Sequence, residues 1–347
     1  MSSPDEFSVT KEQEIRQLAM LRPHVVIVGA GASVASFPRG DRNGRMLPVM
    51  DNLVEVLQLR NLFEKHGVKH EGIGFETLYA ELYEDEKLRP LCTGLEERIS
   101  EYFQQVEIVD DPTIYDHLVL SLRKKDVLAS FNWDPLLLQA YLRVGHKGFH
   151  VPRLIFLHGN VGIGFCEKDR QLGVKGRLCT ECRKSLAPSK LLYPVTKKDY
   201  QSDPMIKGQW DELLAAMKRA FMITIFGYSA PKTDVGAIDL LLNAWKGERE
   251  RELEQVEIID IKTEEELRRT WEPFIFSHHY ETLTDFYESY LARHPRRSGE
   301  AYMNQFIEGK FTEDNPLPKS VGFEELEKWA QPLQHRETLA GYSMFSG

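Results

Sequence analysis

Cysteine, surplus positive charge and long apolar runs are all scarce in this sequence. Its 347 residues contain 4 cysteines, too few for a disulfide scaffold and typical of a reducing compartment. Lys and Arg number 44 against 53 Asp and Glu, so the net charge of −9 provides no overall field for a nucleic-acid backbone. No apolar run approaches the ~20 residues that cross a bilayer, and residues 1–7 are polar and acidic, unlike a signal peptide. We therefore expect a cytoplasmic protein that neither enters a membrane nor binds nucleic acid directly.

The composition is otherwise that of an ordinary folded protein. Hydrophobic residues make up 42% and charged residues 28% of the chain, which excludes disorder over most of its length. A chain of this size is long enough for one large α/β domain with a smaller module attached.

Short apolar segments separated by helical patterns are the main structural signal. They are rich in β-branched residues and lie at 24–28, 126–131, 153–157, 221–226 and 255–259. Continuous apolar runs of this length are typical of strands buried on both faces. The pattern therefore predicts an α/β fold with a doubly wound, parallel, Rossmann-like sheet.

The segments around these strands suggest how the chain is divided. Residues 1–22 are predicted as an N-terminal helix, 23–262 as the catalytic domain and 263–347 as a helical extension. Within the domain we expect a helical insertion at 48–124 and a small irregular Cys-containing module at 161–195. The helical patterns of the extension lie at 264–271, 281–292 and 322–330.

Each predicted strand runs directly into small or polar residues. These groups are Gly29-Ala30-Gly31-Ala32-Ser33, Asn132-Trp133-Asp134, His158-Gly159-Asn160, Gly227-Tyr228-Ser229 and Asp260. In a parallel sheet the carboxyl ends of the strands meet at one edge, and ligands bind in the crevice outside that edge. The sequence therefore predicts one composite site built from several separate strand ends.

Each of these groups also has a purely structural interpretation. The Gly29-x-Gly31 turn either cradles a phosphate with backbone N–H groups or only allows tight packing. Asp134 before a proline fits a helix N-cap, and His158 fits a buried histidine without a function. The third glycine of dinucleotide-binding dehydrogenases is missing, because Ser33 stands near that place, which disfavours a plain dehydrogenase.

The ordered set of motifs resembles the sirtuin family of NAD-consuming enzymes. Over residues 24–262 the chain shows, in the order of that family, Gly-Ala-Gly-x-Ser, Asn-x-Asp, His-Gly, a Cys-x-x-Cys segment and Gly-x-Ser. In detail it is similar to the divergent bacterial sirtuin-like domains of antiphage defence, which hydrolyse NAD. The Leu47-Pro48 pair, behind an inserted loop at 37–45, is similar to a helix start of that branch.

The resemblance implies an NAD glycohydrolase that cleaves NAD, its substrate, into nicotinamide and ADP-ribose. Asn132 would hold the nicotinamide ribose and orient water, Asp134 would fix that loop, and His158 would act as general base, which its ordinary pKa near 6.5 permits. The other contacts fall to small and polar residues: Gly29, Ala30, Gly31 and Ser33 for the diphosphate, Gly227 and Ser229 for the adenosine-side phosphate or ribose, and Asp260 for the adenosine end. Arg42 and Arg45 either close a loop over the phosphate or form a solvated basic loop.

The cysteine segment departs from the family pattern. Deacylating sirtuins hold structural zinc with two Cys-x-x-Cys pairs, whereas this segment offers only Cys166, Cys179 and Cys182. A zinc ion would take these ligands with Asp169, another residue or water in fourth place; otherwise the segment is a relic ribbon held by packing. Cys92 lies far upstream in a helical pattern and is interpreted as a core residue.

The segment that would bind an acylated peptide also departs from the family. Deacylases carry an apolar Val-Val-Trp-Phe-Gly-type run there, whereas residues 190–195 read Lys-Leu-Leu-Tyr-Pro-Val. Pro194 cannot donate the main-chain hydrogen bond that peptide addition to a strand edge needs, which favours hydrolysis. The alternatives are an NAD-dependent protein deacylase or ADP-ribosyltransferase, and a non-catalytic module that senses NAD or ADP-ribose. The presence of both Asn132 and His158 argues against the sensor, because binding alone needs no general base.

An enzyme that destroys NAD needs restraint. We therefore expect gating by homo-oligomerisation or by a partner protein, with the helical parts as interfaces. The resemblance adds that defence systems of this branch often pair the sirtuin-like chain with a second protein, such as a ring-forming P-loop ATPase. The chain itself has no Gly-x-x-x-x-Gly-Lys-[Ser/Thr] loop, so it is not that ATPase.

Overall fold

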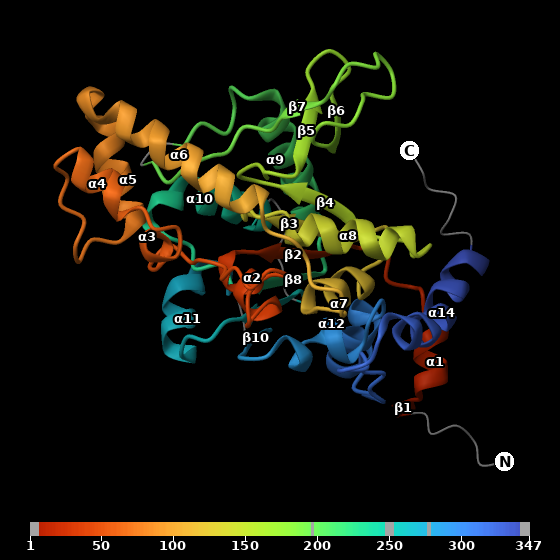
Figure 1. Cartoon of the computed structure of the whole chain (residues 1–347). Coiled ribbons are helices and arrows are strands. Elements are labelled where there is room, and N and C mark those ends of the chain that lie inside the picture. The colour runs from red at the N-terminus through yellow and green to blue at the C-terminus, as the bar shows by residue number, and fades with distance from the viewer. Residues whose placement is uncertain (1–6, 196–197, 247–252, 276–278, 341–347) are drawn as a thin grey trace.

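A six-stranded parallel sheet organises the molecule. The computed structural model describes residues 7–195, 198–246, 253–275 and 279–340 (Figure 1). The strands are β2 (His24–Val28), β3 (Val127–Ser130), β4 (Arg153–Phe156), β8 (Met222–Phe226), β9 (Gln255–Ile259) and β10 (Tyr280–Leu283). Their spatial order is β4-β3-β2-β8-β9-β10, which is the order 3-2-1-4-5-6 of doubly wound dinucleotide-binding sheets. The predicted fold class is confirmed.

Alternating residues of the strands face two separate cores. In β2, Val25 and Ile27 pack into the core under α9 (Pro204–Met217) and α10 (Val235–Lys246). Val26 and Val28 face the opposite core. The helices over that second core include α2 (Ala30–Ser36), α6 (Arg89–Gln104), α7 (Ile114–Leu120) and α8 (Leu136–His146). Burial on both faces explains why the strands read as continuous apolar runs.

The segment 48–124 is mostly helical, as expected. Besides α6 and α7 it contains α3 (Leu53–Val56), α4 (Arg60–Lys65), α5 (Phe75–Glu84) and η1 (Glu86–Leu88). Figure 1 shows α4, α5 and α6 as one group at the side of the sheet, and α6 contacts both of the others. This group covers the edge of the sheet where the first strands end.

The sheet extends beyond residue 262, which corrects the prediction of a helix at 281–292. This segment holds β10, then η4 (Phe286–Glu288) and α12 (Tyr290–Arg293). β10 pairs with β9 in parallel and is the last strand of the sheet. Only Leu283 among its four residues is buried, so an edge strand of this kind lacks the apolar run that marked the central strands.

The Cys-containing module is more regular than the sequence suggests. Three short strands form an antiparallel sheet in the order β6-β5-β7, with β5 (Ile163–Cys166), β6 (Gln171–Val174) and β7 (Ala187–Pro188). Figure 1 shows this sheet projecting from the body of the molecule. Its strands have two to four residues, most of them partly exposed, which is too short for a clear alternating pattern.

The two ends of the described chain lie together. Helix α1 (Lys11–Arg16) packs against α14 (Phe323–Leu339), and β1 (Ser8–Val9) pairs with β11 (Phe311–Thr312). Both helices differ in length from the prediction, because α1 ends before residue 21 and α14 continues through Pro332. The chain between these two helices also forms α13 (Ser298–Tyr302) and, as expected, α11 (Glu264–Trp271).

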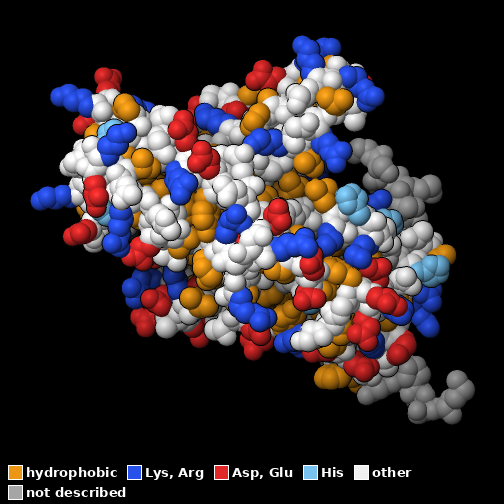
Figure 2. Space-filling model, viewed as in Figure 1, with side chains coloured by type: hydrophobic (Ala, Val, Ile, Leu, Met, Phe, Trp, Pro, Cys, Tyr) orange, Lys and Arg blue, Asp and Glu red, His pale blue; other side chains and the backbone are white. Residues whose placement is uncertain are grey.

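Within the described ranges, no helix has the length and apolar character that a membrane span requires. The face seen in Figure 2 shows acidic and basic side chains interspersed rather than gathered into one basic field.

Candidate functional site

A cavity of about 360 Å³ lies at the carboxyl edge of the sheet. It sits where β2 and β8 are neighbours, the point at which the strand order reverses. Nine of the ten residues that the sequence assigned to catalysis or nucleotide contacts line it: Gly29, Ala30, Gly31, Asn132, Asp134, His158, Gly227, Ser229 and Asp260. Four strand ends and the residue after β9 thus meet around one space.

The glycines at this edge are required by close backbone contact. Gly31 N–H donates to the carbonyl of Gly227 at 2.9 Å. A Cβ on Gly31 would lie 2.8 Å from the Gly227 Cα, and a Cβ on Gly227 only 2.2 Å from the Ala32 nitrogen. Gly227 also has a φ of +61°, which side chains rarely adopt. The tight-packing interpretation of the turn therefore holds, and the N–H groups of Gly29, Gly31 and Ala32 are already used in backbone hydrogen bonds.

Asn132 is fixed by its amide nitrogen. Nδ2 donates to the Gly29 carbonyl at 2.8 Å and to the Ser33 hydroxyl at 2.9 Å, so it joins the end of β3 to the turn after β2. Because the Gly29 carbonyl can only accept, the amide orientation is settled. The structure gives Oδ1 of Asn132 no partner among the described residues, and this oxygen is the part of the amide left for a ligand.

Ser33 lies behind the cavity wall rather than in it. It is 2% exposed and donates to the Asp134 carboxylate at 2.8 Å. Its oxygen is also 2.7 Å from the hydroxyl of Tyr115, which comes from α7. Burial raises the pKa of Asp134, although the hydrogen bond from Ser33 opposes this. Ser33 and Tyr115 therefore act as supports for the Asn132–Asp134 loop, and sequence analysis missed Tyr115 because no local motif marks it.

His158 reaches the same cavity from the end of β4. Its ring packs edge-on against Phe131 with centroids 4.7 Å apart, and Phe131 precedes Asn132 in the chain. Burial lowers the pKa of His158 to about 4, so the imidazole is neutral at pH 7. Its Nε2 is buried and has no hydrogen-bond partner among the described residues. A neutral imidazole with a free nitrogen is able to accept a proton from a bound group.

Asn160 ties together the loops that follow β3 and β4. Its side-chain nitrogen donates to the carbonyl of Asp134 at 2.6 Å, and its side-chain oxygen accepts from Gly162 N–H at 2.9 Å. It is 1% exposed. The loop that carries His158 is therefore locked to the loop that carries Asn132, which fixes the relative position of the two side chains.

The cavity lining also includes residues that the sequence did not single out. Four of them carry polar or charged groups: Glu76 from α5, Lys198 before α9, Tyr228 after β8, and Asp234 in η2 (Lys232–Asp234). Tyr228 is the middle residue of the Gly227-Tyr228-Ser229 motif, so the sequence could have indicated it as a site residue. Lys198 and Asp234 lie in loops far apart in the sequence, where only the fold brings them together.

The helical insertion supplies an apolar side of the cavity. The lining residues from this segment include Pro48, Val49, Met50, Leu53 and Phe103. Arg42 and Arg45 do not line the cavity: Arg42 pairs with Asp110 and Arg45 with Asp41. The insertion therefore closes over the strand ends with apolar contacts, while Arg42 is held by Asp110 outside its loop and Arg45 by Asp41 within it.

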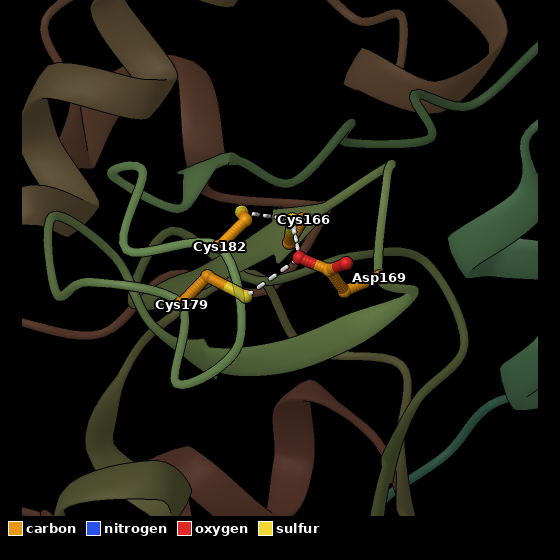
Figure 3. Close-up of side chains that lie close together, drawn as sticks. All are labelled: Cys166, Asp169, Cys179 and Cys182. Carbon is orange, nitrogen blue, oxygen red and sulfur yellow. Dashed lines mark hydrogen bonds between the residues drawn. The ribbon is translucent and has the colours of Figure 1, made fainter.

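The cysteine module brings together three thiols and one carboxylate (Figure 3). Ligand atoms of Cys166, Asp169, Cys179 and Cys182 all lie within 4.8 Å of one another. The Cys166 and Cys182 sulfurs are 3.5 Å apart, and Asp169 Oδ2 is 3.2 Å from the Cys179 sulfur. Cys166 thus lies beside the Cys179–Cys182 pair, and Asp169, one of the alternatives for the fourth ligand, lies next to them. Cys92 lies apart in the core around α6.

This donor set fits zinc. Tetrahedral coordination with Zn–S of about 2.3 Å and Zn–O of about 2.0 Å separates neighbouring ligand atoms by roughly 3.5–3.8 Å, close to the observed spacing. Hydrogen bonding to Asp169 raises the pKa of the Cys182 thiol to about 12. A divalent cation would reverse this effect, because it stabilises the thiolates next to the carboxylate.

No protein-family model and no curated protein matches this chain. Solved structures do match it. A Sir2 homologue mutant in complex with ADP ribose is 14% identical over 94% of this chain and 96% of its own, with a TM-score of 0.36. Sir2 bound to acetylated peptide is 15% identical over 83% and 93% with a TM-score of 0.34, and Sir2Tm bound to a propionylated peptide is 15% identical over 83% and 93% with a TM-score of 0.32. At these identities the likeness concerns the fold alone.

Proposed function

We propose that the protein is an NAD glycohydrolase that cleaves the nicotinamide–ribose bond of NAD. The observation that carries the proposal is the convergence of Asn132 and His158 on one cavity at the switch point of a doubly wound sheet. Dinucleotides bind at such points, close to a glycine turn like Gly29–Gly31. In this proposal the glycine turn contacts the diphosphate, Gly227 and Ser229 the adenosine-side phosphate or ribose, and Asp260 the adenosine end.

The two side chains suit the chemistry of this bond. Its cleavage passes through an oxocarbenium-like state, which needs positioning and exclusion of stray water more than covalent help. Asn132 presents Oδ1 to a ribose hydroxyl or to the attacking water while its nitrogen stays fixed on Gly29. His158 is neutral at pH 7 and accepts the proton of that hydroxyl or water at one of its imidazole nitrogens.

Simple hydrolysis is favoured over deacylation by the backbone at 190–195. Leu192 N–H donates to the His158 carbonyl at 2.9 Å and Val195 N–H to the Tyr193 carbonyl at 2.8 Å, while Pro194 has no N–H. An acylated peptide that added to this segment would find these donors already used. Zinc bound by the cysteine module would stabilise that small sheet and supply no chemistry to the bond.

We also infer that turnover is restrained by homo-oligomerisation or by a partner such as a ring-forming ATPase, in a role of antiphage defence by NAD depletion. Two features support an interface. The described residues after 262 contribute nothing to the cavity lining, and they expose Phe306 (60%) and Phe311 (73%). Light scattering combined with activity assays tests this inference; full turnover by the isolated monomer contradicts it.

The activity test is incubation with NAD while nicotinamide and ADP-ribose are followed by chromatography. Asn132→Ala and His158→Ala should each lower turnover on the order of 10²-fold or more. The exposed residues Asn243 and His146 offer matched controls, and Asn243→Ala and His146→Ala should keep full activity. Release of nicotinamide only with an acylated peptide would identify a deacylase, and unchanged turnover in both site variants would overturn the assignment.

A further inference from the structure

The carboxylate of Asp234 lies close to the imidazole of His158 in the lining of the cavity. Oδ1 of Asp234 lies 3.9 Å from His158 Nε2, and both side chains are almost fully buried, at 4% and 7% exposure. The same Oδ1 accepts from the ammonium of Lys198, whose side chain is 3% exposed. The other oxygen of Asp234 accepts from the Tyr228 hydroxyl at 2.9 Å. The carboxylate therefore has two partners, and the nearest imidazole nitrogen has none among the described residues.

The geometry describes a competition for one oxygen. A separation of 3.9 Å is too long for a hydrogen bond, but a shift of about 1 Å would bring it into range. Lys198 occupies the oxygen that the imidazole would use. In catalytic pairs of histidine and carboxylate, the carboxylate holds the ring in one tautomer and orientation so that the other nitrogen works as a base.

Asp234 and Lys198 also have opposite electrostatic effects on His158. Beyond burial, which has the largest effect on its pKa, Asp234 raises that pKa and Lys198 lowers it. The other groups around this pair come from different elements: Tyr200 before α9, Phe131 after β3, Tyr228 after β8, and Glu76 of α5, which accepts from Thr233 beside Asp234. Of these, Glu76 is the only further group that carries charge near pH 7.

Resting on the proposed function, we propose that Asp234 is the positioning residue of His158. In this proposal an anionic group of the substrate binds Lys198, and the Asp234 carboxylate is released to form a hydrogen bond with the imidazole. Among the described side chains that line the cavity, only Lys198 and Lys262 are cationic, and Lys262 follows β9 at the adenosine end. The diphosphate of a dinucleotide supplies the negative charge that competes with Asp234 for the ammonium. Binding of the substrate then completes the His158–Asp234 pair.

Two isosteric variants separate this pair from a purely structural cluster. Lys198→Met keeps the side-chain length without the charge, and Asp234→Asn keeps the shape of the carboxylate. NMR titration of the His158 imidazole should show a higher pKa in Lys198→Met and a lower one in Asp234→Asn, each shifted by at least half a unit. Wild-type protein saturated with ADP-ribose should shift in the direction of Lys198→Met. Shifts of the same sign in both variants, or no shift in either, would overturn the proposal.

Steady-state kinetics with NAD provide the second readout. Asp234→Asn should lower kcat about 10-fold or more with little change in KM, whereas Lys198→Met should raise KM about 10-fold and lower kcat less than threefold. The acid limb of the kcat/KM profile should move to higher pH in Lys198→Met and to lower pH in Asp234→Asn. The titrations need no turnover, so they test the His158–Asp234 pair separately from the proposed function. The expected pKa shifts without hydrolysis of NAD would support the pair and contradict the proposed function. Hydrolysis of NAD without these pKa shifts would support the proposed function and contradict the pair.

Discussion

Two buried histidines stand at opposite edges of the same sheet. His24 opens β2 at the amino edge, and His158 follows β4 at the carboxyl edge. Burial lowers the pKa of both, to about 3 for His24 and about 4 for His158. Both ring nitrogens of His24 have partners at 2.8 Å, the hydroxyls of Ser298 and Thr224, whereas the described residues give Nε2 of His158 none. A lowered pKa thus reports burial, and the unpartnered nitrogen beside a cavity distinguishes the site.

The amino edge is closed by the C-terminal part of the chain. Arg296 donates to the carbonyls of Leu120 and Leu122, just before β3, and pairs with Glu337 of α14. Arg297 pairs with the same carboxylate, and all three charged side chains are at most 3% exposed. Burial alone would raise the pKa of Glu337, but the two arginines hold it below its ordinary value. This edge uses buried charge for stability, without an open site.

The largest effect should come from breaking that edge. Glu337→Ala leaves two fully buried arginines unpaired, so the free energy of unfolding should fall by about 3–5 kcal/mol. Urea denaturation measures this, with exposed Glu325→Ala of the same helix as control, expected within about 0.5 kcal/mol of wild type. A loss below 1 kcal/mol would show that α14 is not an integral part of the fold.

Replacing each of the two histidines by alanine compares their contributions to stability and to turnover. His24→Ala removes two buried hydrogen bonds and takes away the partner of the Ser298 hydroxyl, whereas Thr224 still donates to Glu257. It should therefore cost about 2–4 kcal/mol of stability. His158→Ala should cost at most about half of that, because its free nitrogen loses no partner. Turnover of NAD per folded molecule should show the opposite order. Equal stability losses would remove the distinction between the two edges.

The strands of the sheet were predictable where both faces are buried. The run at 24–28 is apolar because Val25 and Val26 enter different cores, and the same holds for the other central strands. β10 escaped prediction because it is an edge strand with one buried residue, and its surroundings read as helical. The sequence signal therefore follows burial and fades with it.

The site was predictable to the extent that it follows the strand ends. Asn132 and His158 stand directly after strands, and a parallel sheet must bring such positions to one edge. Ser33 was placed on the correct turn, but only the packing of α7 shows that it supports Asp134 instead of facing the cavity. Lys198 and Asp234 are 36 residues apart in separate loops, and no spacing rule joins them.

Acid should destabilise the protein through both histidines. Each has a folded pKa below 6.5, so below that pH the unfolded chain binds protons that the folded chain refuses, and stability falls as pH drops toward 4. The expected loss is about 2 kcal/mol per histidine between pH 6.5 and 5. Glu257 acts in the opposite direction, because burial raises its pKa to about 7. The free energy of unfolding should therefore be measured against pH for wild type, His24→Gln and the exposed control His146→Gln. Parallel pH dependence in all three proteins would contradict the prediction.

The smallest effect on the site should come from the cysteine module, which lies outside both edges of the large sheet. The purified protein should hold about one zinc ion per chain by elemental analysis, and Cys182→Ser should lose most of it, since one of four ligands is gone. Cys92→Ser is the matched control and should keep the metal, because Cys92 belongs to the core around α6. Because none of the four ligands lines the cavity, NAD turnover in Cys182→Ser should stay within about twofold of wild type while the unfolding temperature falls by a few degrees. Metal-free protein of unchanged stability would instead favour a ribbon held by packing alone.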